Sequence, residues 1–253
     1  MTVRIGLGQM RVVGGDPECN MARAEDMVRE AAISGCDVVV LPECLDLGWT
    51  HPSARTQAEP IPGPRADRLC RAARTYRIHV VAGLTEAAGD RIYNAAILAG
   101  PAGELLLKHR KITILNIASD LYSVGDRLGV VGTSFGFVGL LICADNFPES
   151  LALGRSLALM GARFILSPCA WAVPAAYDNL AEPYGGLWRE TYGTLTTGHD
   201  LVVVGASNVG KIAAGPWQGY RCIGCSLAMG PGGSVLFQAP FGEDAEGLHQ
   251  VEC

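Results

Sequence analysis

The stretch from residue 139 to residue 160 constrains the fold of this chain more than any other part of the sequence. An apolar run, Gly139–Ile142, stops at Cys143, an acidic turn containing Pro148 follows, and residues 150–160 have helical periodicity. This order is typical of a strand that leads into a helix in a parallel sheet. Ligands bind at the carboxyl ends of such strands, so Cys143 is expected at a functional site, near a helix N-terminus that favours its thiolate. The alternative is a buried structural cysteine.

The rest of the chain alternates between strand-like and helix-like segments. Strands are expected over 3–9, 37–43, 79–84, 91–98, 104–107, 163–167, 201–206, 223–229 and 234–238, and helices over 21–34, 65–77 and 188–198. Asn20 is expected to cap the first helix, and residues 48–64 carry enough turn formers to predict a loop. The chain has no evident linker, low-complexity segment or repeat, so the sequence predicts one α/β domain over residues 1–253.

The composition narrows the class of protein. The chain has 253 residues, of which 49% are hydrophobic and 18% charged, as in a globular enzyme with a large core. Its net charge of −5 and the absence of a long basic run argue against nucleic acid as a partner. No apolar run is long enough for a membrane span or a signal peptide, so no membrane partner is expected. Nine cysteines without a secretion signal predict free thiols and a cytoplasmic location.

Three reactive side chains follow separate strand-like segments: Glu43, Lys111 and Cys143. A thiol nucleophile needs a base, and a shielded carboxylate can serve as one. An oxyanion needs positive charge or N–H donors, which Lys111 and the backbone of Ala144 can supply. Considered alone, each residue has a structural alternative: Glu43 could be a helix cap, and Lys111 could belong to a solvated basic patch. Together the three residues predict an acyl-transfer site.

The order and spacing of these residues resemble the signature blocks of the nitrilase superfamily, the carbon–nitrogen hydrolases. The blocks comprise residues 39–43, 109–111 and 141–149, and the resemblance continues through residues 167–171, 207–210, 224–226 and 230–236. It therefore extends over nearly the whole chain. The resemblance implies a four-layer αββα sandwich, a Glu–Lys–Cys triad, no metal, no organic cofactor, and a homodimer or larger homo-oligomer.

The resemblance also implies a role for each matching residue. Cys143 would be the nucleophile and Glu43 the base that takes its proton. Lys111 and the Ala144 amide would hold the oxyanion. An amide substrate would lose ammonia, leave a thioester on Cys143, and be released by a water that Glu43 activates.

Two departures from the family pattern bear on activity and substrate. The second glutamate that many members have in the loop after the lysine is absent, and Asp120 is the stand-in that this loop offers. Many members have Tyr or Asn just after the cysteine and Arg three positions on, where this chain has Ala144 and Asn146. N-carbamoyl-amino-acid hydrolases of the family grip a substrate carboxylate with arginines in that turn. With Asn146 and Phe147 there, we expect a neutral small amide.

Other motifs carry weaker hypotheses. Cys222 and Cys225 form a Cys-x-x-Cys, but no second such pair or nearby His accompanies them, which argues against zinc. A redox role predicts a reversible disulfide between them, although they lie in a strand-like run. Trp171 and Trp188 are pocket candidates or core residues. The sequence has no Gly-x-Ser-x-Gly, P-loop or dinucleotide motif, which excludes serine hydrolases and nucleotide enzymes.

The sequence thus predicts a thiol hydrolase of non-peptide C–N bonds, an amidase acting on a small amide. A nitrilase, with a nitrile substrate, and an N-carbamoyl amidohydrolase are the alternatives within the class. The alternative from another class is a non-catalytic binding or assembly module on the same fold, supported by the missing second glutamate. The possible substrate pocket would include Asp120, Asn146, Phe147 and Trp171. The acyl group itself is not encoded in any motif.

Overall fold

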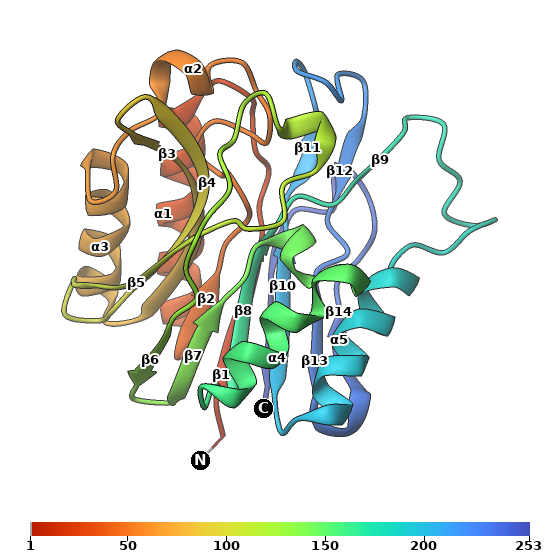
Figure 1. Ribbon diagram of the computed structural model, residues 1–253. Helices are drawn as coiled ribbons and strands as arrows, with labels where there is room; N and C mark the ends of the chain where they lie inside the picture. Colours follow the sequence, from red (N-terminus) through yellow and green to blue (C-terminus); the bar gives the residue numbers. More distant parts are fainter. Residues whose placement is uncertain (1) are drawn as a thin grey trace.

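The computed structural model describes residues 2–253 and contains two six-stranded sheets packed face to face, with helices on both outer faces (Figure 1). The predicted four-layer αββα sandwich is therefore confirmed. The first sheet has the order β15-β1-β2-β3-β4-β5 and the second the order β14-β13-β10-β8-β7-β6. A small third sheet, β11-β12-β9, completes the strands.

The elements have the following bounds. In the first sheet they are β1 (Arg4–Gln9), β2 (Val38–Val40), β3 (His79–Ala88), β4 (Arg91–Ala99), β5 (Leu105–Arg110) and β15 (Gly247–Glu252). In the second they are β6 (Val130–Thr133), β7 (Gly136–Leu140), β8 (Phe164–Cys169), β10 (Val202–Ser207), β13 (Leu227–Gly230) and β14 (Ser234–Gln238), and in the third β9 (Ala172–Val173), β11 (Val209–Lys211) and β12 (Arg221–Ile223). The α-helices are α1 (Pro17–Ile33), α2 (Ala54–Gln57), α3 (Pro64–Tyr76), α4 (Leu151–Leu159) and α5 (Gly186–Gly198).

Parallel strands form the centre of each sheet. In the first, β1, β2 and β3 are parallel, and in the second β7, β8 and β10 are parallel. The remaining pairs in both sheets are antiparallel. The parallel strands within a sheet end at the same edge, which brings together the loops that follow β7 and β8. A backbone hydrogen bond from the Glu43 N–H to the Cys169 carbonyl joins the loop after β2, from the other sheet, to the end of β8.

Three apolar cores hold the four layers together. The middle core lies between the sheets and includes Leu7, Val40, Leu140 and Val204. Helices α1 and α3 cover the outer face of the first sheet, and α4 and α5 cover that of the second (Figure 1). Buried on both faces, the central strands are continuous apolar runs, which is why the sequence shows them as branched hydrophobic stretches.

Several boundaries differ from the sequence expectations, and the strand expected over residues 223–229 is divided between β12 and β13, which lie in different sheets. Strand β2 ends at Val40 and β7 at Leu140, so both strands leave their sheet before the reactive residue that follows. Helix α1 begins at Pro17, because Asp16 Oδ1 accepts a hydrogen bond from the backbone N–H of Cys19. The expected cap, Asn20, is instead buried inside the helix. The expected loop over residues 48–64 contains the short helix α2.

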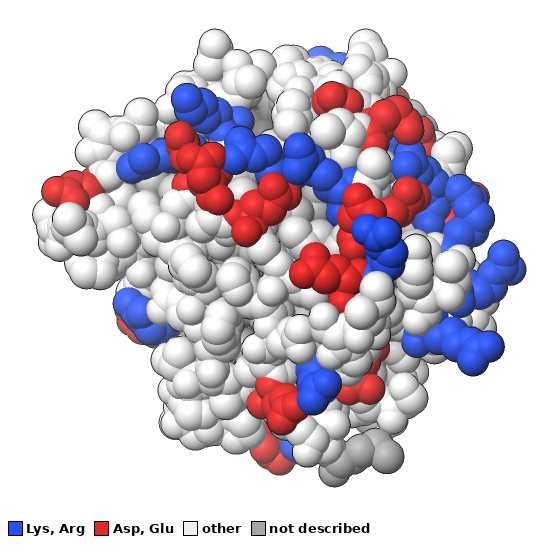
Figure 2. Space-filling model, turned by 180° about the vertical axis from the view of Figure 1, so that it is seen from behind, with Lys and Arg blue, Asp and Glu red and all other residues white. Residues whose placement is uncertain are grey.

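The surface charge and the helix lengths can be compared with what the composition predicts. On the face in Figure 2, acidic and basic side chains lie beside one another instead of forming a broad area of one sign. Within residues 2–253, no helix has the length and apolarity that crossing a membrane would require.

Candidate active site

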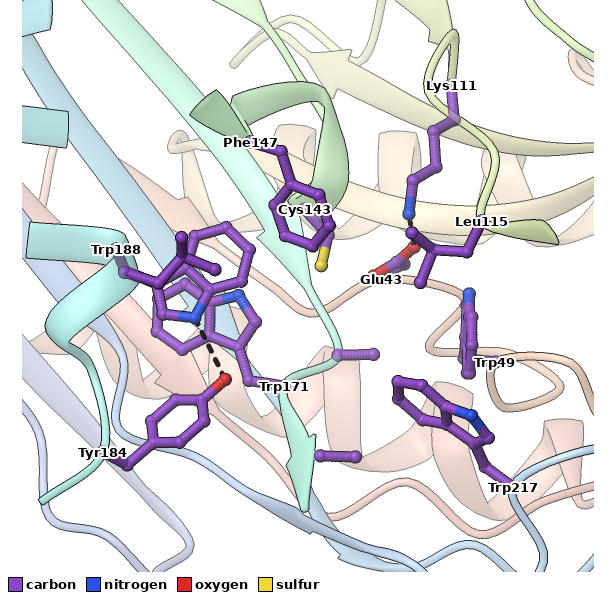
Figure 3. Close-up of a pocket in the computed structure, with 13 residues that line it drawn as sticks. Glu43, Trp49, Lys111, Leu115, Cys143, Phe147, Trp171, Tyr184, Trp188 and Trp217 are labelled. Carbon is purple, nitrogen blue, oxygen red and sulfur yellow. Dashed lines mark hydrogen bonds and ion pairs between the residues drawn. The ribbon is translucent and has the colours of Figure 1, made fainter. Parts of the chain in front are cut away.

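The structure brings Glu43, Lys111 and Cys143 to one pocket (Figure 3). Glu43 follows β2, Lys111 follows β5, and Cys143 follows β7, so the three side chains come from both sheets. The cavity has a volume of about 170 Å³. It is lined by Glu43, Trp49, Lys111, Leu115, Cys143, Phe147, Ala170, Trp171, Ala172, Tyr184, Leu187, Trp188 and Trp217. We call this cavity the pocket below.

Glu43 and Lys111 form a buried ion pair. Lys111 Nζ donates to Glu43 Oε1 at 2.6 Å, and both side chains are almost completely buried. Asn94 Nδ2, from β4, donates to the same oxygen at 2.6 Å. Glu43 Oε2 is buried and has no hydrogen-bond partner among residues 2–253. One carboxylate oxygen is thus fixed by two donors, while the other stays available to accept a proton.

Backbone contacts fix the position of Glu43 across the two sheets. Its backbone N–H donates to the carbonyl of Cys169, at the end of β8, at 3.1 Å. Gly83 of β3 lies against the same turn, where an added Cβ would be 2.5 Å from the Glu43 Cα. Only a glycine allows the chain that carries Glu43 to approach β3 so closely.

Cys143 sits on a strained turn. Its φ of 43° is in the left-handed region, which side-chain-bearing residues rarely adopt, and it begins the short 3₁₀ helix Cys143–Asn146. Its backbone N–H donates to Ser167 Oγ at 3.2 Å, and Asn146 Nδ2 donates to its carbonyl at 3.3 Å. The Ala144 N–H makes no hydrogen bond within residues 2–253. The turn therefore holds Cys143 against β8 and leaves an amide donor beside it.

The environment of Cys143 stabilises a neutral thiol. A hydrogen bond with the Cys169 thiol, burial and the charge of Glu43 raise the pKa of Cys143 well above its ordinary value, although Lys111 opposes the shift. This direction is opposite to the expectation that a helix N-terminus favours the thiolate: Cys143 begins a short 3₁₀ turn, and α4 starts only at Leu151. Burial alone would lower the pKa of Lys111, but Glu43, Cys143 and Asp145 raise it, so the lysine is a cation.

Aromatic side chains form most of the pocket wall. Trp171 and Trp188 stack with ring centroids 4.7 Å apart, and Trp188 Nε1 donates to Tyr184 Oη at 3.0 Å. Trp49 and Trp217 are also 4.7 Å apart. Figure 3 shows these two groups on opposite sides of the opening beside the cysteine sulfur.

Two of the predicted pocket residues lie elsewhere. Asp120 is exposed and does not line the pocket, so Glu43 is the only carboxylate among the lining residues. Asn146 is buried behind Cys143, where its Nδ2 donates to Ser167 Oγ at 3.0 Å. Phe147 and Trp171 do line the pocket.

Sequence reasoning missed several residues of the site. Asn94 is one, although a polar residue before the apolar run 95–99 is a signal that it has a buried partner. Trp49, Trp217 and Tyr184 come from segments far apart in the chain, and nothing local marks them as neighbours.

The other cysteines form no functional cluster. All nine are free, and Cys222 and Cys225 are both buried. Burial raises the pKa of Cys222 to about 12 and also raises that of Cys225, which makes both poor redox groups. Across residues 2–253, no group of three His, Cys, Asp or Glu side chains is arranged to hold a metal ion.

Known proteins resemble the chain over most or nearly all of its length. A nitrilase of Pyrococcus abyssi is 33% identical, covering 99% of this chain and 90% of that protein. The omega-amidase NIT2 of Mus musculus is 33% identical, covering 71% of this chain and 68% of that protein. A solved amidase of the nitrilase superfamily from Nesterenkonia AN1 superposes with a TM-score of 0.82 at 23% identity, covering 99% of this chain and 90% of its own, and shares its fold.

The family assignment follows from the sequence as a whole. The pattern of the family described as carbon-nitrogen hydrolase matches residues 4–253. This match agrees with the sandwich fold, with the relatives and with the grouping of Glu43, Lys111 and Cys143. The chain belongs to the carbon–nitrogen hydrolase family.

Proposed function

We propose that the protein is a thiol amidase, which converts a small primary amide to a carboxylic acid and ammonia through a thioester on Cys143. The observation that carries the proposal is the buried Glu43–Lys111 pair in the same pocket as a strained, half-buried cysteine. A neutral thiol next to a carboxylate with one unpaired oxygen is suited to proton transfer during attack.

In the first half of the reaction, Cys143 Sγ attacks the amide carbon while Glu43 Oε2 takes the thiol proton. The oxyanion forms next to Lys111 Nζ and the Ala144 N–H, which stabilise its charge. Glu43 then returns the proton to the amide nitrogen, the C–N bond breaks, and ammonia leaves a thioester on the sulfur.

In the second half, Glu43 takes a proton from a water molecule that attacks the thioester carbon. The same two donors hold the second oxyanion. The C–S bond breaks, the proton passes from Glu43 to the sulfur, and the acid is released. The sum is one amide and one water converted to one acid and one ammonia.

The relatives support amide chemistry. Several are named omega-amidases, and another structure, of a double mutant of the Nesterenkonia amidase, is a complex with acrylamide, which is a primary amide. A nitrile substrate is the second candidate, because the nitrilase of Pyrococcus abyssi matches almost the whole chain. The single domain, the homo-oligomer and the cytoplasmic location stay predictions, the last supported by nine free thiols.

Intact-mass spectrometry with parallel ammonia measurement tests the proposal. Wild type, Cys143→Ala and the control Cys19→Ala are incubated with small amides, nitriles and ureido acids. Wild type and Cys19→Ala should release ammonia from amides and carry an acyl adduct, and Cys143→Ala should do neither. Ammonia release that survives Cys143→Ala would disprove the thioester route. No adduct and no ammonia from any compound would favour the non-catalytic module.

A further inference from the structure

The pocket has two aromatic walls that face each other across the space beside the nucleophile (Figure 3). Trp171 and Trp188 are on one side and Trp49 and Trp217 on the other. Aromatic surfaces stabilise flat or branched hydrocarbon groups by burying apolar area and by offset or edge contacts. The walls therefore favour an apolar substituent.

The charged groups of the pocket are already paired. Glu43 and Lys111 are its only charged lining residues, and they are joined at 2.6 Å. The indole N–H of Trp188 donates to Tyr184 Oη, and that of Trp171, which has no partner among residues 2–253, is an uncharged donor. A charged substituent on the substrate would lose its water here and find no counter-ion of its own.

The turn after the nucleophile supplies no cation either. The Asn146 side chain is turned away from the opening, into contacts with the Cys143 carbonyl and Ser167 Oγ. The next residue, Phe147, contributes its ring to the wall, 5.5 Å from that of Trp188. A substrate carboxylate has no partner at this turn.

The volume limits the size of the acyl group. The cavity of about 170 Å³ is close to the volume of an apolar cavity of about 150 Å³ that holds one benzene molecule. A long chain or a fused ring system would not fit without movement of the walls.

We propose that the pocket selects an uncharged hydrocarbon acyl group no larger than about one benzene ring, and rejects acyl groups that end in a carboxylate or an ammonium. This inference rests on the proposed amidase function. It distinguishes this protein from enzymes that recognise a charged group on the substrate in addition to the amide.

Two pairs of isosteric amides test the selectivity. 4-Methylpentanamide and succinamate differ only in an isopropyl group replaced by a carboxylate, and pentanamide and 4-aminobutanamide differ only in a methyl group replaced by an ammonium. In each pair, the neutral amide should have a kcat/KM at least about 100-fold higher, since a hydrophobic site leaves an added polar group unpaired. Equal kcat/KM values within a pair, or a higher kcat/KM for the charged amide, would overturn the inference about selectivity. Ammonia release from these amides would still support the amidase proposal.

A binding measurement separates the two proposals. Quenching of tryptophan fluorescence reports binding of the same amides to Cys143→Ala, which keeps the pocket walls. If no amide releases ammonia from wild type, the amidase proposal fails, but tighter binding of the neutral member of each pair still upholds the selectivity. If the charged amide of a pair binds Cys143→Ala as tightly as the neutral one, or more tightly, the selectivity proposal is overturned, with or without ammonia release by wild type.

A positive charge introduced at the edge of the pocket tests the selectivity against a control charge placed elsewhere. Leu187 lines the pocket and is 41% exposed, so Leu187→Arg adds a cation without burying it. The ratio of kcat/KM for 4-methylpentanamide to that for succinamate should fall roughly two- to fivefold, which corresponds to the free energy of an exposed ion pair. Leu180→Arg is the control, because Leu180 is 94% exposed and lies outside the lining. An equal change in both variants would contradict a local effect on the pocket.

Discussion

His109 Nε2 donates to Asp145 Oδ2 at 2.9 Å, with both side chains buried. The same carboxylate accepts hydrogen bonds from the backbone N–H groups of Ile112, Thr113 and Ile142 at 3.0, 2.7 and 3.0 Å. These bonds join the segment that carries Lys111 to the turn that carries Cys143. Asp145 thus fixes the distance between two reactive side chains without lining the pocket itself.

Asp145→Asn should therefore weaken both the fold and the reaction. The amide replaces one acceptor oxygen with a donor that faces donors, so we expect the free energy of unfolding to fall by about 2 to 4 kcal/mol. Urea unfolding and kcat measure the two effects. Asp126→Asn, a change at an exposed position, is the control and should alter neither. Unchanged stability in Asp145→Asn would mean that the buried bonds contribute nothing.

Asn94→Ala should lower kcat more than it changes KM. The variant removes one of the two donors that hold Glu43 Oε1, and a hydrogen bond to a charged group contributes enough to predict a loss of about 10- to 100-fold. Steady-state kinetics gives the two constants. Asn116→Ala, at an exposed residue of the following loop, should behave as wild type. A rise in KM at constant kcat would contradict a role in positioning the base.

Alkylation of Cys143 should depend on pH as for a thiol of raised pKa. The contact with Cys169 and burial favour the neutral form, so the thiolate appears only as pH rises above the ordinary value of 9.0. Peptide mapping after treatment with a small neutral alkylating reagent gives the rate at each pH. The midpoint should lie above that of a free cysteine peptide. A midpoint below about 8 would show a stabilised thiolate instead.

The buried carboxylate of Glu86 should make the free energy of unfolding depend on pH in the acidic range. Burial alone would raise the pKa of Glu86, but hydrogen bonds from Arg110 and Lys108 lower it below 4.5. A depressed folded-state pKa stabilises the fold above the unfolded value, and the contribution is lost as pH falls through the folded value. Glu86→Gln should cost about 1 to 3 kcal/mol at pH 7, with the difference shrinking below pH 4.5.

Urea unfolding of wild type and Glu86→Gln between pH 7 and pH 3 measures this dependence. Glu104→Gln is the control, because Glu104 is exposed on the neighbouring turn. A difference between wild type and Glu86→Gln that stays constant over this range would contradict the linkage.

Most of the fold follows from local patterns in the sequence. Branched apolar runs ended by turn formers predict the central strands, and apolar spacing predicts α1, α3, α4 and α5, because both signals arise within a few residues. The ends of β2 and β7 were predicted less well. Leu41, Leu141 and Ile142 are as apolar as the strands before them, so hydropathy does not mark the point where each strand leaves its sheet.

The sequence by itself determined the family, through motif blocks spread along the chain, and most of the central strands and helices, since each of these elements depends on residues close together. It also predicted Glu43, Lys111 and Cys143 as the site. Tertiary structure alone decided that Asn94 holds the carboxylate and that Asp120 stays outside the pocket. It also decided that burial and neighbouring groups raise the pKa of the Cys143 thiol and that the walls are aromatic. These properties depend on burial and on contacts between loops that follow different strands, and no local pattern encodes the distance between such loops.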